Sequence, residues 1–372
     1  MPKNQRLHFK DIPALRAMAF LPIYLFCILF LISASETGVL SDITTIIGKI
    51  ARNSLDFFFF LSAFLITSHG LREYKYYDRF CLRNFYIRRF FRVGVVLLLA
   101  MLFTFIVDPW LIKILALDLK LVVQPTIEPF IALVPNYFSS FSGDHFVYLK
   151  VITSIFMFIQ FYVFWGIILK FFYRYLAVIG LVLIGIGILS RILHLYNETE
   201  YLLDTLAYST PIGIGCLYAI AIRNGWAFTT KMKEFSKSTN SFIYVVGVAI
   251  LLAGYLVFSQ SYLSALIPLF TSLFFGYIII EQTFGKSSFV RFKTKKVLTQ
   301  IGIISYGLII YQAIINVLVI VAVDSIDFKL DSFLKIAMVV IGALIGSVIT
   351  ANISYKLLEK PLLRIRREFK KV

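Results

Sequence analysis

Charged residues are scarce in this sequence, since Asp, Glu, Lys and Arg make up only 15% of its 372 residues. In soluble domains about 25% of the residues are charged. Hydrophobic residues make up 59% of the chain, which has a mean hydropathy of +0.85. This balance excludes an ordinary soluble protein and predicts an all-α integral membrane protein. Little sequence is left for an additional soluble domain, so we expect residues 1–372 to form a single transmembrane domain.

About ten segments are long and apolar enough to cross a bilayer, for which roughly 20 mostly apolar residues are needed. They lie near residues 12–34, 54–71, 84–106, 147–171, 175–195, 205–222, 241–258, 261–281, 298–323 and 332–358. The sequence has no internal repeat and no linker rich in Pro, Gly or Ser. The largest piece outside the predicted spans is residues 107–146, which we expect either to line a site or to form an aromatic cap at the membrane interface.

Acidic residues are fewer than basic ones, 20 against 37, which leaves a formal net charge of +17. Lys and Arg gather in alternate loops and in the tail, whereas the loops between them are richer in Asp and Glu. By the positive-inside rule this alternation predicts that both termini are cytoplasmic. Topology and attraction to anionic lipid therefore explain the charge. The expected partner is the lipid bilayer, and no nucleic acid is needed.

Cysteine and histidine are rare. The three cysteines are Cys27, Cys81 and Cys216, and none is placed to form an external disulfide framework. The four histidines are His8, His69, His145 and His194, and none lies in the middle of a predicted span. Histidine is the usual base near neutral pH because its unperturbed pKa is about 6.5. The sequence indicates no metal site.

Ionisable residues are also rare within the predicted spans. Arg16 lies at the cytoplasmic mouth of span one, and Asp56 lies at the external mouth of span two. Arg16 either snorkels to the interface or has a partner or water inside the membrane. Asp56 either pairs with Arg52 or acts as a general base. The middles of the spans are otherwise expected to be free of charge, which argues against an ion-coupled transporter.

Five motifs in order resemble those of the acyltransferase-3 family, which are bacterial membrane O-acyltransferases. "LRAMAFLPIYLF" is similar to the first span of the family, and "SLDFFFFLSAFLIT" is similar to its Asp-x-Phe-Phe-x-Leu-Ser signature through Asp56 and Ser62. "FYIRRFFRVG" resembles the Arg-rich start of span three. "IGIISYGLIIYQ" resembles a late-span motif that holds Tyr306, and "ISYKLLEKPLLRIRR" resembles the terminal motif through Glu359. The resemblance extends from Leu15 to Arg367.

The resemblance implies transfer of an acyl group, commonly acetyl from acetyl-CoA, to a hydroxyl of a cell-envelope glycan, glycolipid or lipid-linked sugar. It also implies a bacterial cytoplasmic (inner) membrane protein that takes acyl-CoA as its co-substrate. Arg88, Arg89 and Arg92 are then candidates for binding the phosphates of coenzyme A, because guanidinium groups match phosphate geometry. Anchoring by the positive-inside rule explains the same arginines equally well.

The chain departs from the family where chemistry is expected. The histidine of the first span is replaced by Cys27, and the histidine of the late span by Gln312. Phe158 and Ile159 stand in the acidic positions before Gln160. Tyr208 and Thr210 stand where Arg and Asp are usual before Gly215. The alternative to an enzyme is therefore a catalytically inactive relative that serves in binding, passage or scaffolding during envelope polysaccharide synthesis.

The candidate site residues keep alternative interpretations. The catalytic candidates are Arg16, Cys27, Asp56 and Gln312, and the further pocket candidates are Ser62, Gln160, Tyr306 and His145. Cys27 is a packing residue, a polar lining residue or an acyl carrier, but a buried thiol is a poor nucleophile without a cation or base beside it. Gln312 and Gln160 hydrogen-bond but do not titrate. They either line a pocket or join helices.

Overall fold

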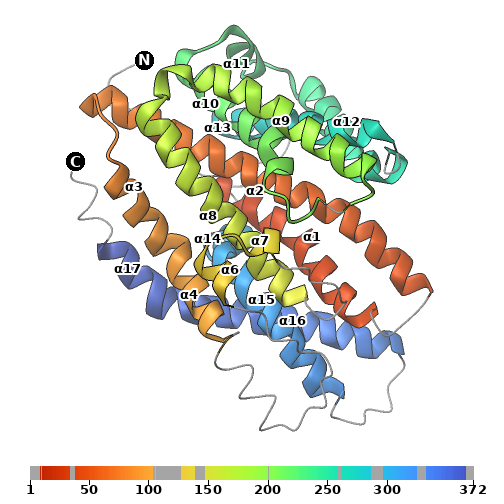
Figure 1. Cartoon of the computed structure of the whole chain (residues 1–372). Helices are drawn as coiled ribbons and strands as arrows, with labels where there is room; N and C mark the ends of the chain where they lie inside the picture. The colour runs from red at the N-terminus through yellow and green to blue at the C-terminus, as the bar shows by residue number, and fades with distance from the viewer. Residues whose placement is uncertain are drawn as a thin grey trace.

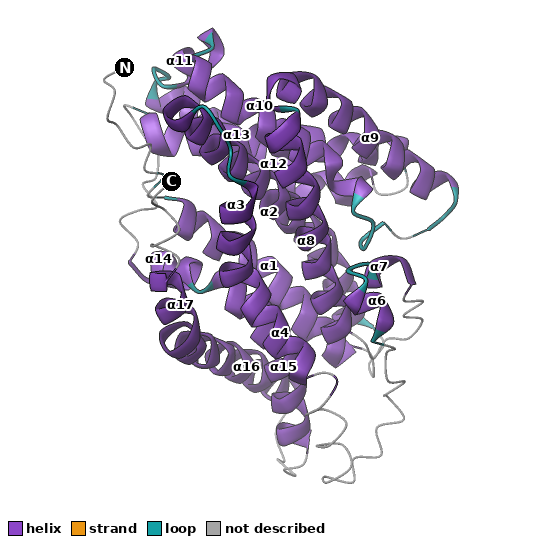
Figure 2. Cartoon of the chain, turned by 60° about the vertical axis from the view of Figure 1, so that its left-hand side comes forward, coloured by secondary structure: helices purple, strands orange, loops and turns teal. Residues whose placement is uncertain are grey.

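The computed structural model describes residues 9, 11–33, 38–103, 105, 127–138, 147–199, 201–258, 261–285, 296–324 and 332–365 (Figure 1). These residues are mainly helical and contain no strand (Figure 2). The longer helices are α1 (Ile12–Ser33), α2 (Val39–Tyr77), α8 (Val147–Phe171), α9 (Leu176–Tyr196), α10 (Ser209–Asn224), α12 (Lys237–Phe258), α13 (Ile267–Phe284), α15 (Ser305–Asp324) and α16 (Ser332–Ser354).

Shorter helical elements connect them. The α-helices among these are α3 (Leu82–Arg89), α4 (Val95–Leu102), α6 (Glu128–Ile131), α7 (Pro135–Phe138), α11 (Ala227–Met232), α14 (Lys296–Ile303) and α17 (Lys360–Ile365). Two segments are π-helical, η1 (Phe90–Gly94) and η7 (Tyr355–Glu359). Three are 3-10 helices, η3 (Tyr173–Tyr175), η4 (Leu206–Tyr208) and η5 (Tyr262–Leu266).

Nine helical segments in the described part of the chain are long and apolar enough to span a membrane. They correspond to nine of the ten predicted spans. The remaining prediction, residues 84–106, falls on α3, η1 and α4, which carry Arg83, Arg88, Arg89 and Arg92. Arginine inside a membrane is costly unless it has partners. This segment therefore depends on partners supplied by its neighbours.

Helix α2 is the longest element and the centre of one half of the molecule. Its 39 residues rise about 58 Å at 1.5 Å each, compared with about 30 Å for the hydrocarbon core of a bilayer. The sequence predicted a span only over 54–71, with Asp56 at its mouth. Because α2 begins at Val39, Asp56 lies within the helix and is fully buried. The helix thus begins 15 residues before the predicted span, and Asp56 is enclosed by protein.

Helix α10 packs closely against α2 and α9. A side chain at Gly215 would meet the backbone carbonyl of Phe60 on α2. Small residues at a helix interface allow two backbones to approach. The glycine that the sequence motif highlights in span six therefore brings α10 against α2.

Helix α1 joins the two halves of the molecule. It packs against α2 on one side and against α14, α15 and α16 on the other. Helix α8 contacts α1, α2, α4 and α15, and Figures 1 and 2 both place it beside α2. The space among α1, α2, α8 and α15 is where the candidate site lies.

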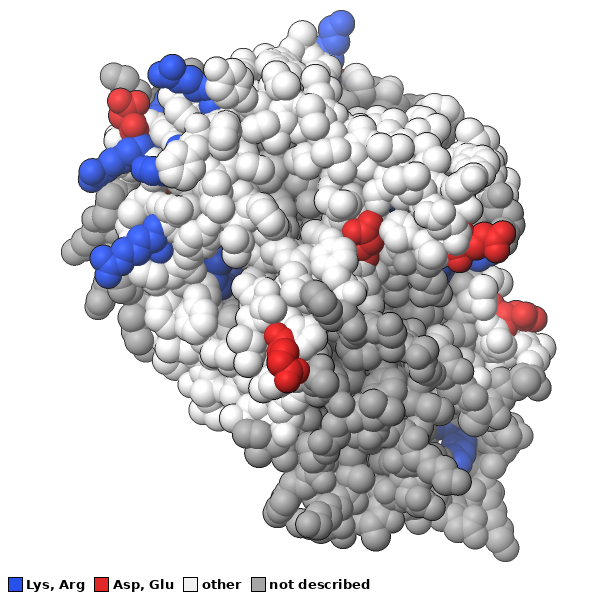
Figure 3. Space-filling view, in the orientation of Figure 1, with Lys and Arg blue, Asp and Glu red and all other residues white. Residues whose placement is uncertain are grey.

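Charge is distributed unevenly along the molecule. On the face shown in Figure 3, most Lys and Arg lie at the end where Figure 1 places α3 and α11, and most Asp and Glu lie toward the opposite end. The last turns of α2 and α11, with Lys75 and Lys231, contribute basic residues, and the first turn of α2 carries Asp42. The alternation seen in the sequence thus becomes a difference between two ends of one helical bundle.

Candidate functional site

Three arginines from separate parts of the sequence converge on two tyrosines. Arg16 of α1 and Arg92 of η1 both lie over the ring of Tyr306, with their Cζ atoms 5.3 and 4.8 Å from its centroid. Arg89 of α3 lies over the ring of Tyr162 on α8, with Cζ 5.1 Å from the centroid. We call these five residues the arginine cluster. An aromatic face attracts a cation most strongly where water is excluded.

A π-helical turn contributes to the arginine cluster. η1 separates α3 from α4 and contains Arg92. Arg89 lies three residues earlier, and residues three apart are neighbours on a helix surface. A π turn adds a residue within a helix and is frequent at functional sites. The π turn lets α3 and η1 direct Arg89 and Arg92 inward before the apolar helix α4 begins.

Arg16 is buried, with 6% of its surface exposed, so it does not snorkel to an interface. Its Nε atom has no hydrogen-bond partner among the described residues. A buried guanidinium with unused donor capacity is unfavourable unless an acceptor or water reaches it. Of the two interpretations made from the sequence, the structure therefore favours a partner or water inside the protein.

A carboxylate also joins the arginine cluster. Glu359, at the end of the second π segment η7, is 6% exposed and interacts electrostatically with Arg92. Its Oε1 atom lacks a hydrogen-bond partner within the described residues. The cluster together with Glu359 holds three guanidinium groups and one carboxylate. The excess positive charge and the unused donor of Arg16 can accommodate an anion that brings acceptor oxygens.

The three arginines predicted as a phosphate site do not stay together. Arg88 forms an ion pair with Glu73 of α2, with Nη2 3.3 Å from Oε2. The other oxygen of Glu73 accepts the backbone N–H of Cys81 at 2.8 Å. Arg88 thus fastens the loop between α2 and α3. Of these three arginines, only Arg89 and Arg92 belong to the arginine cluster.

A cavity of about 310 Å³ begins at the arginine cluster, because Tyr306 forms part of its lining. It follows one face of α2, where the lining residues are Thr44, Thr45, Gly48, Lys49, Ala51, Arg52, Leu55, Phe58 and Ser62. From Thr44 to Ser62 the helix rises about 27 Å. The cavity is therefore elongated along α2, and most of its remaining lining is apolar.

The cavity brings together several residues singled out in the sequence. Cys27, Ser62 and Tyr306 line it, and so does Phe158, which stands in a position that is acidic in the acyltransferase-3 motif. Gln312 is fully buried, and its Nε2 atom lies 4.0 Å from the sulfur of Cys27. Cys27 and Gln312, which the sequence analysis singled out together, are thus neighbours in space, although 285 residues separate them.

Asp56 does not line the cavity but forms a buried ion pair. Its Oδ1 atom lies 2.6 Å from Nη2 of Arg191 on α9, and the two side chains are 0% and 2% exposed. Arg191 also donates through Nε to the carbonyl of Ala207 at 2.9 Å and lies over the ring of Tyr201. The sequence proposed Arg52 as the partner and did not single out Arg191. The observed pair fastens α2 to α9.

Gln160 is engaged in joining segments. Its Nε2 atom donates to the carbonyl of Leu133 at 2.7 Å and to Oδ1 of Asn136 at 2.8 Å. Its Oε1 atom accepts from Thr205 at 2.5 Å. Gln160 is absent from the lining of the cavity. Of its two predicted roles, the joining of elements is therefore the one that the contacts support.

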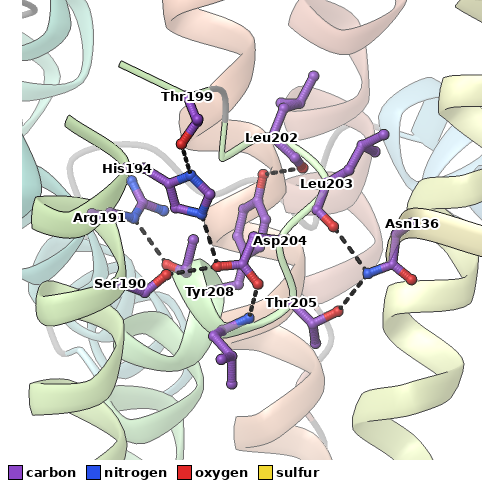
Figure 4. Close-up of polar contacts among 12 residues, drawn as sticks. Asn136, Ser190, Arg191, His194, Thr199, Leu202, Leu203, Asp204, Thr205 and Tyr208 are labelled. Atoms are coloured by element: carbon purple, nitrogen blue, oxygen red, sulfur yellow. Dashed lines mark hydrogen bonds and ion pairs between the residues drawn. The ribbon is translucent and has the colours of Figure 1, made fainter. Parts of the chain in front are cut away.

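The two described histidines lie outside the arginine cluster, although His69 is close enough to interact electrostatically with Arg89 and Arg92. His69 lies on α2, where its Nδ1 atom is 2.5 Å from the carbonyl of Leu65. His194 lies in the last turn of α9 and contacts Asp204 and Thr199 (Figure 4). His8 and His145 lie outside the described residues. Neither described histidine is part of the cavity lining.

The fold and the site define a multi-pass α-helical membrane protein with a buried, positively charged site at one end of an elongated cavity. Its lipid-facing surface includes α12 and α9, whose apolar side chains are largely exposed. Comparisons with protein-family models, curated proteins and solved structures find no match to this chain.

Proposed function

We propose that this protein is a membrane O-acyltransferase that moves an acyl group, such as acetyl, from acyl-CoA to a hydroxyl of a cell-envelope glycan, glycolipid or lipid-linked sugar. One observation carries this proposal: Tyr306 belongs both to the arginine cluster and to the lining of the cavity. A phosphate-bearing donor held by the arginines would bring its thioester to the end of a space that can admit an acceptor.

The uneven charge supports an orientation for this reaction. The basic end of the bundle would face the cytoplasm by the positive-inside rule, which places both termini there in a bacterial inner membrane. Arg16 lies in the first turns of α1, and Arg89 lies on α3 near the same end. The arginine cluster would then be reached from the side on which acyl-CoA is made. The far end of the cavity, near Thr44, would be reached from outside.

We assign each group a task. Arg89 and Arg92 would hold phosphate oxygens, since guanidinium groups form paired charge-assisted hydrogen bonds with phosphate. Arg16, with its unused donor, would bind a further oxygen of the donor. The described residues that line the cavity include no His, Asp or Glu. Tyr306 would therefore react as its phenolate and accept the proton of the acceptor hydroxyl, because the two guanidinium groups at its ring stabilise the negative charge of the phenolate.

A second function is favoured by that same lining. Because the described residues that line the cavity include no His, Asp or Glu, none of them is a usual base for acyl transfer. It would then be a catalytically inactive relative that binds a donor or an acceptor as part of envelope polysaccharide synthesis. Binding without turnover is the outcome that would support this alternative.

The first experiment measures acetyl-CoA binding and acetyl transfer by purified protein in nanodiscs. We expect Arg89→Ala with Arg92→Ala to weaken acetyl-CoA binding more than tenfold, because each lost charged hydrogen bond costs about 1.5–3 kcal/mol. Arg88→Ala is the matched control, since Arg88 is paired with Glu73 and should leave binding unchanged. Equal effects of these variants, or no binding by the parent protein, would refute the donor site.

A further inference from the structure

A second group of reactive side chains lies at the end of α9, away from the cavity. Two residues after the last residue of α9, Glu198 adopts the left-handed conformation, with φ 53°. The N–H of Thr199 donates to the carbonyl of His194 at 2.9 Å, and the N–H of Glu198 donates to that of Leu195. This is the hydrogen-bond pattern of a Schellman turn. It folds the chain back so that the side chain of Thr199 returns to His194.

The side chains of Thr199, His194 and Asp204 form a continuous line of contacts. Nδ1 of His194 lies 2.7 Å from Oγ1 of Thr199, and Nε2 lies 3.1 Å from Oδ2 of Asp204. Figure 4 shows His194 between the other two side chains. A carboxylate only accepts hydrogen bonds, so Nε2 carries the proton of the neutral ring. Nδ1 is then the acceptor for the Thr199 hydroxyl.

Asp204 is held firmly in this position. Its Oδ2 atom also accepts from Ser190 at 2.7 Å, and its Oδ1 atom accepts from the N–H of Leu206 at 3.0 Å and from Tyr137 at 3.4 Å. These donors hold the carboxylate in a fixed orientation. A fixed carboxylate orients the imidazole and stabilises the imidazolium that forms when the ring takes a proton.

The line of contacts is accessible. Thr199 is exposed, and the side chain of His194 is 22% exposed. The two residues line an open pocket together with Leu195, Glu198 and Tyr262. A hydroxyl, a base beside it and a carboxylate behind the base are the arrangement that activates a nucleophile. The pocket gives a substrate access to the hydroxyl.

We propose that Thr199, His194 and Asp204 form a site that cleaves acyl esters and carries the acyl group on Thr199. His194 Nδ1 takes the hydroxyl proton while Oγ1 of Thr199 bonds to the carbonyl carbon of the ester. The bond from that carbon to the leaving oxygen breaks, and the proton on Nδ1 passes to the leaving alcohol. Water or an acceptor hydroxyl then attacks the acyl-threonine in the same way. Its proton passes through His194 to Thr199.

This activity does not rest on the proposed donor site. It uses no residue of the arginine cluster and needs no coenzyme A. Its substrates are small acyl esters presented from the end of the molecule that carries Asp42, opposite the basic end. If the site works together with the cavity, Thr199 would receive or release acyl groups at the outer side. Ester cleavage at Thr199 can be measured whether or not the site works together with the cavity.

The test is hydrolysis of p-nitrophenyl acetate by the full chain in nanodiscs, followed by mass spectrometry of the peptide that contains Thr199. We expect p-nitrophenol release and an added acetyl group on Thr199. His194→Gln and Asp204→Asn should slow release by about 10²–10⁴-fold, the usual contribution of general base catalysis. Thr199→Val should remove both signals, and Thr199→Ser should restore them.

Two controls keep the result interpretable. Thr230→Val alters another exposed threonine whose hydroxyl bonds only within α11, and His69→Gln alters the other described histidine. Thermal unfolding of each variant shows whether the fold persists. Release that is equal in the parent, Thr199→Val and His194→Gln proteins, or acetyl found on other residues instead, would overturn the proposal. Loss of acetyl-CoA binding in the Arg89 and Arg92 variant should leave ester cleavage intact.

Discussion

Asp56 of α2 and Arg191 of α9 form an ion pair in which Oδ1 and Nη2 are 2.6 Å apart and neither side chain is more than 2% exposed. Removing one partner of such a pair leaves the other charge buried and uncompensated. Removing both leaves no charge behind. A variant that lacks one partner should therefore be less stable than would be expected from the loss of one interaction, and a variant that lacks both should be less affected.

The first prediction follows from this pair. Asp56→Asn or Arg191→Met should each destabilise the protein by about 3–5 kcal/mol, since each isolates a buried charge. The double variant should lose less than the sum of the two single effects. Thermal unfolding in detergent measures all three. Strict additivity would mean that the two residues are not coupled.

The second prediction concerns Tyr306. If its phenolate oxygen accepts a proton during transfer, Tyr306→Phe should lower acetyl transfer by about 10²-fold or more while acetyl-CoA binding changes little. Tyr311→Phe is the matched control, because Tyr311 lies on the same helix and bonds to Ser354 at 2.7 Å, outside the cavity lining. Comparable turnover in the Tyr306→Phe protein and its parent would show that another group takes the proton.

The third prediction concerns Cys27. Its sulfur contacts the amide of Gln312, and an amide cannot take a proton from a thiol. We therefore expect no hydroxylamine-sensitive acyl label on Cys27 after incubation with radiolabelled acetyl-CoA. Cys27→Ala should retain most acetyl transfer, as should Cys216→Ala, which alters a second buried cysteine. A label that Cys27→Ser removes would instead establish Cys27 as an acyl carrier.

Several features of the candidate site were accessible from the sequence. The motif around "IGIISYG" highlighted Tyr306, and "SLDFFFFLSAF" highlighted Ser62; both line the cavity. Arg16 stood out because an arginine so close to an apolar span needs a partner or water. These positions could be singled out because the signal is carried by a single residue. A polar residue in an apolar helix is visible without knowing what it contacts.

Pairings between distant residues were not accessible in the same way. Asp56 and Arg191 are 135 positions apart, and Arg52 was the nearer and simpler choice. The separation of Arg88 from Arg89 depends on Glu73, a residue in the preceding helix. The sequence placed His194 only outside the middle of a span and did not connect it with Asp204, which lies ten residues later. The turn at Glu198 and the loop after it bring these side chains together.

Composition and the spacing of apolar runs were enough to establish a multi-pass helical membrane protein, because each span must hold its own length of apolar residues in lipid. The alternation of basic loops was enough to predict an uneven charge along the bundle. The packing of α1, α2, α8 and α15 decided which arginines meet Tyr306 and Tyr162, and where a cavity remains. Such contacts depend on how helices pack, and helix packing joins residues that the linear order keeps apart.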